Sequence, residues 1–156
     1  MTTAPVISNS SPIIGLERIG QLQLLQALFN AIVVPPAVVR EVGSETVLPA
    51  WIEQRDLMQA IGPRILSAAL GAGESQAISL ALEVQPRLLI LDDRPARRLA
   101  QALHVPVIGT VGVLLLAKRA QLLSAIRPSL DALLLHDFRI SQRLYEQVLI
   151  DADERT

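Results

Sequence analysis

The sequence predicts an α/β fold with a mostly parallel sheet. Short apolar runs alternate with segments whose apolar residues recur at helical spacing, which is the pattern of parallel strands joined by helical crossovers. The run at residues 88–91 is apolar throughout, so we expect it to be covered on both faces. The chain has 156 residues, of which 51% are hydrophobic and 19% charged, and this suits one domain with a real core.

The predicted strands are short. In chain order they cover residues 5–7, 31–34, 51–58 (a weakly alternating edge strand), 88–91 and 105–108. Because the first and later strands are followed by polar groups, we expect these groups to converge at one edge of the sheet.

Helices are predicted from helical spacing of apolar residues and from capping residues. Ser10 or Ser11 can cap the first helix, with Pro12 in its first turn, and Ser141 can cap the last one. The later helices are expected at residues 22–29, 36–42, 63–70, 74–83, 95–103, 110–119, 122–135 and from 141 to about 153.

The composition excludes several classes of protein. The chain has no cysteine, which excludes disulfides and thiolate metal sites. Aromatic residues make up 3% and the net charge is -1, which argues against a base-stacking platform and against a global electrostatic footprint for nucleic acid. The strongly apolar run at 108–117 is far shorter than the roughly 20 residues that span a bilayer, and the N-terminus does not resemble a signal peptide. We therefore expect a cytoplasmic protein with no membrane partner.

Two adjacent aspartates, Asp92 and Asp93, directly follow the apolar run at 88–91. The carboxyl ends of parallel strands are where open α/β sheets bind ligands. Adjacent like charges disfavour each other's ionisation unless a cation or a helix end compensates them. Either carboxylate can cap the next helix, which has Pro95 in its first turn, or the pair can help to hold a divalent cation.

Three further polar residues lie where an apolar segment meets a helix end or follows one. Asn9 follows the first strand, Glu41 lies in the helix after the second strand, and Glu74 follows a glycine-rich run at 71–73 that is expected to be a flexible hinge. Taken singly, Glu41 can be an exposed helix residue, and Glu74 can stabilise a helix N-terminus. Together with the two aspartates, they are candidate oxygen ligands.

Six segments extend this pattern over nearly the whole chain. They are VISNSSPII at 6–14, VPPAVVREV at 34–42, LGAGESQAI at 70–78, LILDDRPAR at 89–97, VIGTVG at 107–112 and FRIS at 138–141. Their order and spacing resemble the PIN-domain nucleases, in particular a PIN-like subfamily found among bacterial and archaeal toxin–antitoxin proteins and long labelled only as a domain of unknown function. Residues 1–156 are therefore expected to form a single PIN-like domain.

The resemblance implies a three-layer α/β/α sandwich around a central, mostly parallel sheet. It also implies an acidic pocket that binds Mg²⁺ or Mn²⁺ and cleaves RNA phosphodiesters. Carried over to this sequence, the catalytic acids are Glu41, Glu74 and Asp93, with Asp92 as neighbour or alternate, and Asn9 occupies the position of the family's first-strand aspartate. These five residues are the candidate metal ligands. A divalent cation lowers the pKa of bound water and acts as a Lewis acid, and hard cations prefer oxygen ligands.

Substrate and partner residues also follow from the resemblance. Ser10 and Ser11 match the small hydroxyl residues that follow the family's first-strand acid. Arg94, Arg97 and Arg98 come directly after the acidic pair and are either phosphate contacts or a solvated helix face. The expected partners are an RNA substrate, a cognate antitoxin protein and a second copy of the chain in a homodimer.

Asn9 is the departure from the family pattern. An amide oxygen can coordinate a cation, but it carries no charge and cannot take a proton. Neither His104 nor His136, both expected at the surface or a helix end, has a visible partner for acid–base work. The site can work with Asp92 supplying the lost charge, or be weak and need high Mn²⁺, or have lost catalysis. Two functions follow, a metal-dependent ribonuclease that is the toxin of a toxin–antitoxin pair, and a non-catalytic PIN-like binding module.

Overall fold

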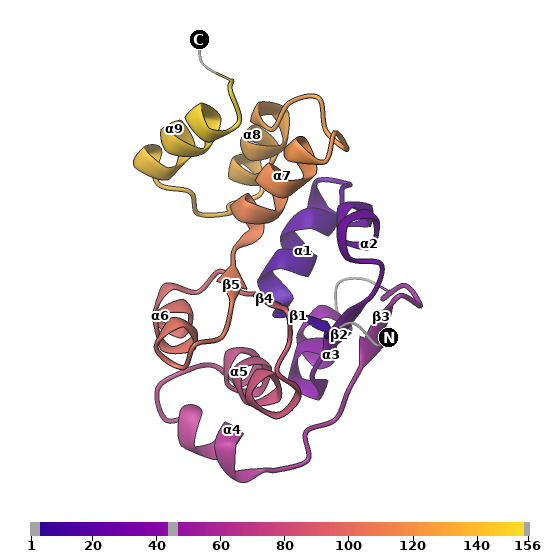
Figure 1. The fold of residues 1–156 in the computed structure, drawn as a ribbon, viewed down its shortest axis with the longest axis vertical. Helices are drawn as coiled ribbons and strands as arrows, with labels where there is room; N and C mark the ends of the chain where they lie inside the picture. Colours follow the sequence, from indigo (N-terminus) through magenta and orange to yellow (C-terminus); the bar gives the residue numbers. More distant parts are fainter. Residues whose placement is uncertain (1–3, 44–46, 155–156) are drawn as a thin grey trace.

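A five-stranded, all-parallel sheet forms the centre of the protein in a computed structural model that describes residues 4–43 and 47–154 (Figure 1). The strand order is β3-β2-β1-β4-β5. The strands are β1 (Val6–Ser8), β2 (Ile32–Val34), β3 (Ile52–Gln54), β4 (Leu88–Ile90) and β5 (Val107–Ile108). The predicted parallel sheet is confirmed, and the edge strand predicted at 51–58 is present as β3, although it is shorter.

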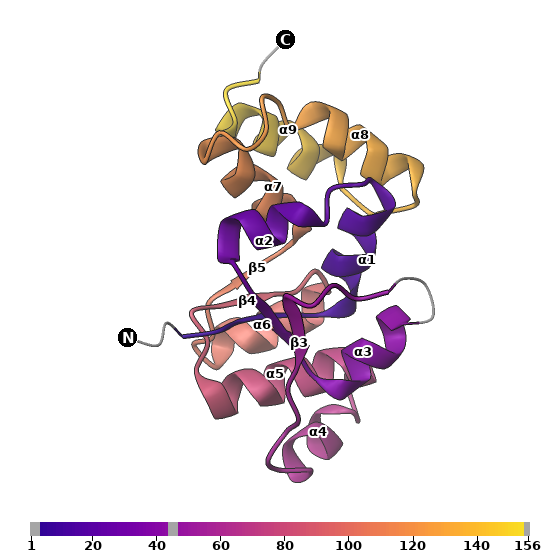
Figure 2. The same cartoon turned by 90° about the vertical axis from the view of Figure 1, so that its right-hand side faces the viewer.

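Helices cover both faces of the sheet, which confirms the three-layer α/β/α sandwich (Figure 2). One hydrophobic cluster receives residues from α1 (Ser10–Arg18), α2 (Gln23–Phe29), α3 (Pro36–Gly43), α7 (Thr110–Arg119), α8 (Arg127–Leu135) and α9 (Gln142–Asp151). The other receives residues from α5 (Ala72–Val84) and α6 (Arg94–Ala102), and α4 (Ile61–Leu66) packs on α5.

Successive residues of the inner strands alternate between the two clusters. Val6 and Ile90 belong to the first, whereas Ile7 and Leu89 belong to the second, and all four are buried. This period of two is the side-chain alternation of a strand. Because both faces are covered, the strands read as continuous apolar runs in the sequence.

The order in which strands are added to the sheet reverses at β1. The chain builds β2 and β3 on one side of β1, then β4 and β5 on the other. The pairing continues past the strand ends, where Asn9 N–H donates to Ile90 O at 2.9 Å and Leu91 N–H donates to Ile108 O at 2.8 Å. The carboxyl ends of β1 and β4 therefore flank a topological switch point, the usual ligand site of such folds.

Two predictions about helix starts are wrong: the capping residue of α1 and the first residue of α8. The N-cap of α1 is Asn9, not Ser10 or Ser11, and its side chain makes no capping hydrogen bond. The helix predicted from 122 begins at Arg127, where the N–H groups of Ile126 and Arg127 donate to the Glu154 carboxylate. By contrast, Ser141 caps α9 as predicted, since its Oγ accepts from Leu144 N–H at 3.1 Å.

The apolar run at 108–117 packs in the core. It forms the end of β5 and most of α7, where Val113, Leu114 and Ala117 are fully buried. In the part of the chain that the structure describes, no helix combines the length and the apolar character needed to cross a membrane.

Glu154 joins the C-terminal end of the described chain to the start of α8. Its carboxylate accepts from Ile126 N–H at 2.7 Å, from Arg127 N–H at 3.2 Å and from Lys118 Nζ at 2.9 Å. Burial alone would raise the pKa of this carboxyl, but the hydrogen bonds from Ile126, Lys118 and Arg127 hold its pKa below the ordinary value. Glu154 therefore does for α8 what an N-cap side chain does for other helices, because Ile126 at the N-cap cannot.

We expect Glu154→Gln to lower the free energy of unfolding at neutral pH by about 1.5–3 kcal/mol, the range for hydrogen bonds to a charged group. Because the folded pKa is depressed, the stabilisation is present above the ordinary glutamate pKa and is lost as pH falls through the folded value. Urea unfolding at about pH 7 and about pH 3 checks this, with the exposed Glu146→Gln as control. An equal loss at both pH values would contradict the linkage.

Candidate active site

The candidate residues lie at the carboxyl edge of the sheet. Asn9 follows β1, and Asp92 and Asp93 follow β4 on the other side of the switch point. Glu74 lies in the first turn of α5, and Glu41 lies in α3, which packs against α5. The structure divides these five residues into two groups.

The first group forms around Gly73. A Cβ atom placed on Gly73 would overlap Oε1 of Glu41 and lie 3.0 Å from Oδ1 of Asn9. The two oxygens therefore face the same small space beside the first turn of α5, and only glycine leaves that space open. The prediction of a flexible hinge at 71–73 is wrong, because Gly71 is the N-cap of α5 and Gly73 is a buried helical residue. Its glycine is required for close approach rather than for flexibility.

Oδ1 of Asn9 is a buried acceptor without a donor. Asn9 is 1% exposed, and its Oδ1 has no hydrogen-bond partner among the described residues. An unsatisfied buried polar group costs about 1–3 kcal/mol, so in a native structure it requires an explanation, such as an ion. An unpaired amide oxygen beside a carboxylate oxygen has the donor chemistry that a hard cation prefers.

Glu41 and Glu74 are coupled electrostatically. The pKa of Glu41 is raised above its ordinary value, first by burial of the carboxyl and then by the negative charge of Glu74, while Arg40 opposes the shift. The Glu74 carboxylate folds back along its own helix, so that Oε2 lies 2.7 Å from the position of a Cβ on Gly71. A carboxylate whose charged form is disfavoured by a second negative charge, beside an unpaired oxygen, forms a locally electronegative site.

Asp92 belongs to a different arrangement. Its Oδ1 accepts from Thr110 N–H and its Oδ2 accepts from Thr110 Oγ1, each at 2.7 Å. Burial raises the pKa of Asp92, although the Thr110 hydrogen bonds and the nearby Arg97 charge favour the carboxylate. Gly109 allows this packing, because a Cβ there would lie 2.8 Å from Asp92 Oδ1 and 2.9 Å from Arg97 Nη1. Both oxygens of Asp92 thus fasten the end of β4 to the start of α7.

Asp93 caps α6. Its Oδ2 accepts from Ala96 N–H at 3.0 Å, and Pro95 lies in the first turn. The capping alternative for the aspartate pair therefore applies to Asp93. This residue is exposed, and it lines the cleft described below together with Glu74 and Asp92.

The acids do not form one compact cluster. Across residues 4–43 and 47–154, no three histidine, aspartate or glutamate side chains come together as a group that could hold a metal ion. Glu41 lies beside Asn9 and within electrostatic range of Glu74, whereas Asp92 and Asp93 are engaged by Thr110 and by α6. A cation here would rely on the amide oxygen of Asn9 in addition to the two glutamates.

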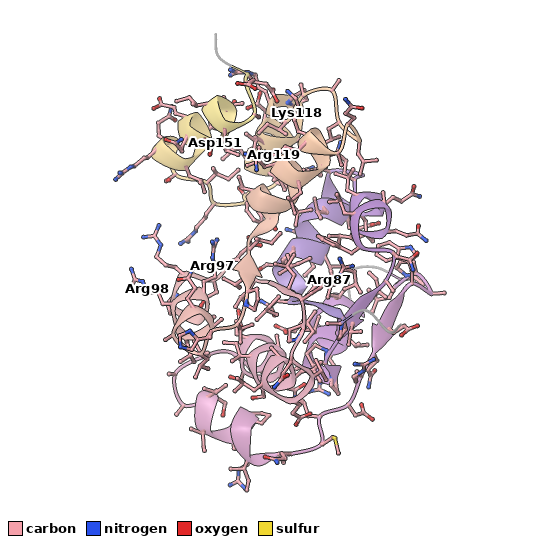
Figure 3. The ribbon with its side chains drawn as sticks, viewed as in Figure 1. Arg87, Arg97, Arg98, Lys118, Arg119 and Asp151 are labelled. Atoms are coloured by element: carbon pink, nitrogen blue, oxygen red, sulfur yellow. The ribbon has the colours of Figure 1, made fainter. Side chains whose placement is uncertain are left out.

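A cleft of about 1540 Å³ is lined by Glu74, Asp92 and Asp93, whereas Asn9 and Glu41 are not among its lining residues. Its walls come from α1, α6, the β5–α7 junction and the connection between α8 and α9. The predicted Ser11, Arg94, Arg97 and Arg98 line it, but Ser10 does not and is buried in the first turn of α1. Figure 3 shows Arg97 and Arg98 on α6, on the side toward the C-terminal helices.

Sequence reasoning missed three residues of this region. Thr110 holds Asp92, and Arg18 and Arg139 line the cleft. The only available signals were the VIGTVG and FRIS segments, which contain Thr110 and Arg139 without indicating a role.

Both histidines are exposed, as predicted. His104 follows α6 with a φ of 61°, and His136 is the C-cap of α8 at the rim of the cleft.

A family model described as a PIN domain matches residues 5–154, which is nearly the whole chain. No curated protein and no solved structure matches the chain.

Glu74→Gln is expected to lower the pKa of Glu41 toward its ordinary value. The shift should be partial, since burial is a larger cause than the charge of Glu74. NMR titration of the Glu41 side chain without metal measures it, and Glu53→Gln on the exposed edge strand is the control. An unchanged Glu41 titration would show that the two carboxylates are not neighbours.

Gly73→Ala is expected to displace the Glu41 carboxylate from Asn9 and to weaken Mn²⁺ binding about tenfold or more, as for lost metal-site groups. The effect on stability should be smaller, because the end of a flexible glutamate side chain can move aside. Calorimetric Mn²⁺ titration and thermal melting separate the two effects. Gly43→Ala, at a site with nothing within 4 Å, is the matched control. Unchanged Mn²⁺ binding in Gly73→Ala would place the cation elsewhere.

Proposed function

Because the chain belongs to the PIN-domain family, whose fold is nuclease-like, we propose that it is a metal-dependent ribonuclease whose cation is held by Asn9, Glu41 and Glu74. The observation that carries the proposal is the buried, unpaired Oδ1 of Asn9, which faces the Glu41 carboxylate across Gly73. PIN domains are generally dependent on divalent metals, and the oxygen-only donor set here suits Mg²⁺ or Mn²⁺.

The residues have distinct tasks in this proposal. The bound cation would supply an activated water and a Lewis acid for phosphodiester hydrolysis. Glu41 and Glu74 provide the negative charge that attracts it, and a cation here would offset the burial and the Glu74 charge that raise the pKa of Glu41. Asn9 contributes an amide oxygen that is held in place, because Asn9 is buried directly after the central strand β1.

The aspartates support the site from the other side of the switch point. Asp92 positions the start of α7 through Thr110, which fixes one wall of the cleft. Asp93 faces the cleft and is the remaining candidate for a direct catalytic part, as cation ligand or proton acceptor. Arg94, Arg97 and Arg98 line the same cleft and would contact substrate phosphates, with Ser11 beside them.

The second candidate function is a non-catalytic binding module. It is favoured by the lack of charge on Asn9 and by the absence of any three-acid group among the described residues. A toxin role with a cognate antitoxin, a homodimer and a cytoplasmic location remain predictions from the resemblance.

RNA cleavage tests the proposal directly. We expect a labelled single-stranded RNA to be cleaved with Mn²⁺ or Mg²⁺ but not with EDTA, and Glu41→Gln to reduce cleavage about 100-fold. Glu53→Gln, an exposed acid on the edge strand, should leave cleavage unchanged.

Asn9→Asp distinguishes a weak site from a lost one. A carboxylate adds a full charge and a stronger ligand, so Mn²⁺ binding should tighten and cleavage should rise. Without metal the melting temperature should fall, because the new charge lies beside Glu41. If wild type and Asn9→Asp both bind no Mn²⁺ and cleave nothing while folded, the binding-module function replaces the nuclease.

A further inference from the structure

The cleft has a second wall that the proposed reaction does not use. Residues 138–141, the FRIS segment, connect α8 to α9 and line the cleft along their whole length. Phe138 is anchored there, because its ring atoms lie 3.3 Å from the position of a Cβ on Gly15 of α1. The wall is therefore fixed to the body of the fold rather than carried by the C-terminal helices alone.

Cationic side chains face this cleft from two separate elements. Arg94 and Arg98 come from α6, and Arg139 comes from the 138–141 segment. All three are exposed, and none of them forms a hydrogen bond or ion pair with any described residue. Elsewhere Lys118 is paired with Glu154, and Arg87 lies over the ring of Phe29. The cleft is also lined by carboxylates, which are Glu74, Asp92, Asp93, Asp137 and Asp151, so it is not basic throughout. The unpaired arginines are instead individual points at which an anionic ligand can be held.

The size and lining of the cleft indicate an extended ligand. Its volume of about 1540 Å³ exceeds the roughly 300–1,000 Å³ of small-molecule pockets. Apolar side chains also line it, among them Ile14, Val111, Leu115 and Phe138. An unpaired nucleic-acid strand presents phosphates along its length and flat apolar base faces, which matches a lining of arginines and apolar side chains.

We infer that the 138–141 segment is a binding wall for single-stranded nucleic acid, with Arg139 contacting a backbone phosphate opposite the α6 arginines. The inference rests on the proposed function in taking RNA as the ligand, but it concerns binding and requires no cleavage. Among the described residues that line the cleft, Phe138 is the single Phe, Tyr or Trp side chain, so affinity should come mainly from phosphate contacts. Binding should therefore depend weakly on sequence and strongly on salt.

Binding without metal tests the inference independently of catalysis. The probe is a fluorescein-labelled RNA of about ten uridines, within the site sizes of strand-binding domains, followed by anisotropy in EDTA over a range of salt. Arg139→Ala should weaken binding about threefold or more and reduce the slope of log K against log salt by about 0.7, the value for one lost phosphate contact on a single strand. Arg139→Lys should restore most of the slope.

The matched control is Arg143→Ala, an exposed arginine in the first turn of α9 that does not line the cleft. It should change neither affinity nor slope. Equal effects of Arg139→Ala and Arg143→Ala would overturn the inference, as would equal binding of a duplex of the same length. Competition by a glutamate-rich peptide at the concentration of the RNA would assign the wall to a protein partner instead. Binding that behaves as expected, with no cleavage in Mn²⁺, would support this wall and reject the nuclease.

Discussion

β1 lies at the centre of the sheet, and its parallel pairing with β2 and β4 sets the position of every group in the candidate site. The chain leaves β1 on one side and returns on the other, so the carboxyl ends of β1 and β4 become neighbours at the switch point. Asn9 is buried because it continues the central strand, and its N–H still pairs with β4. The first turn of α5 then brings Gly73 against Asn9, and this contact admits the carboxylate of Glu41.

The acids of this edge differ in how their charge is compensated. Asp92 is held by two hydrogen bonds from Thr110, and Asp93 by the first turn of α6, so both contribute to the fold as they stand. Glu41 instead has a pKa raised by burial and by the charge of Glu74, and it faces an oxygen without a donor. The negative charges of Glu41 and Glu74 thus lie close enough to interact, and a cation bound between them would stabilise both.

The sequence predicted the elements of the fold well where the signal is local. Apolar runs located β1, β2 and β4, and Ser141 marked the start of α9. Errors arose where a distant residue decides the outcome. The start of α8 depends on the Glu154 carboxylate, 28 positions from Ile126, and spacing of apolar residues cannot indicate it.

The candidate site shows the same limit. The order of the acids along the chain predicted one sheet edge, but it could not divide the aspartates from the glutamates. That division depends on Thr110, 18 positions from Asp92. A glycine-rich run before a helix is also ambiguous, since flexibility and close approach both require glycine, and only the contact with Asn9 and Glu41 identifies the use of Gly73.

The central claim, that Asn9 and Glu41 share a divalent cation, is tested most directly by a crystal structure determined with Mn²⁺. Anomalous scattering from manganese locates the ion without reference to activity. The predicted result is an anomalous peak beside Gly73, between Oδ1 of Asn9 and the Glu41 carboxylate, with Glu74 turned toward it. An anomalous peak confined to Asp92 and Asp93 would contradict the claim. An anomalous map with no peak at this edge of the sheet, from a crystal grown with Mn²⁺, would also contradict it.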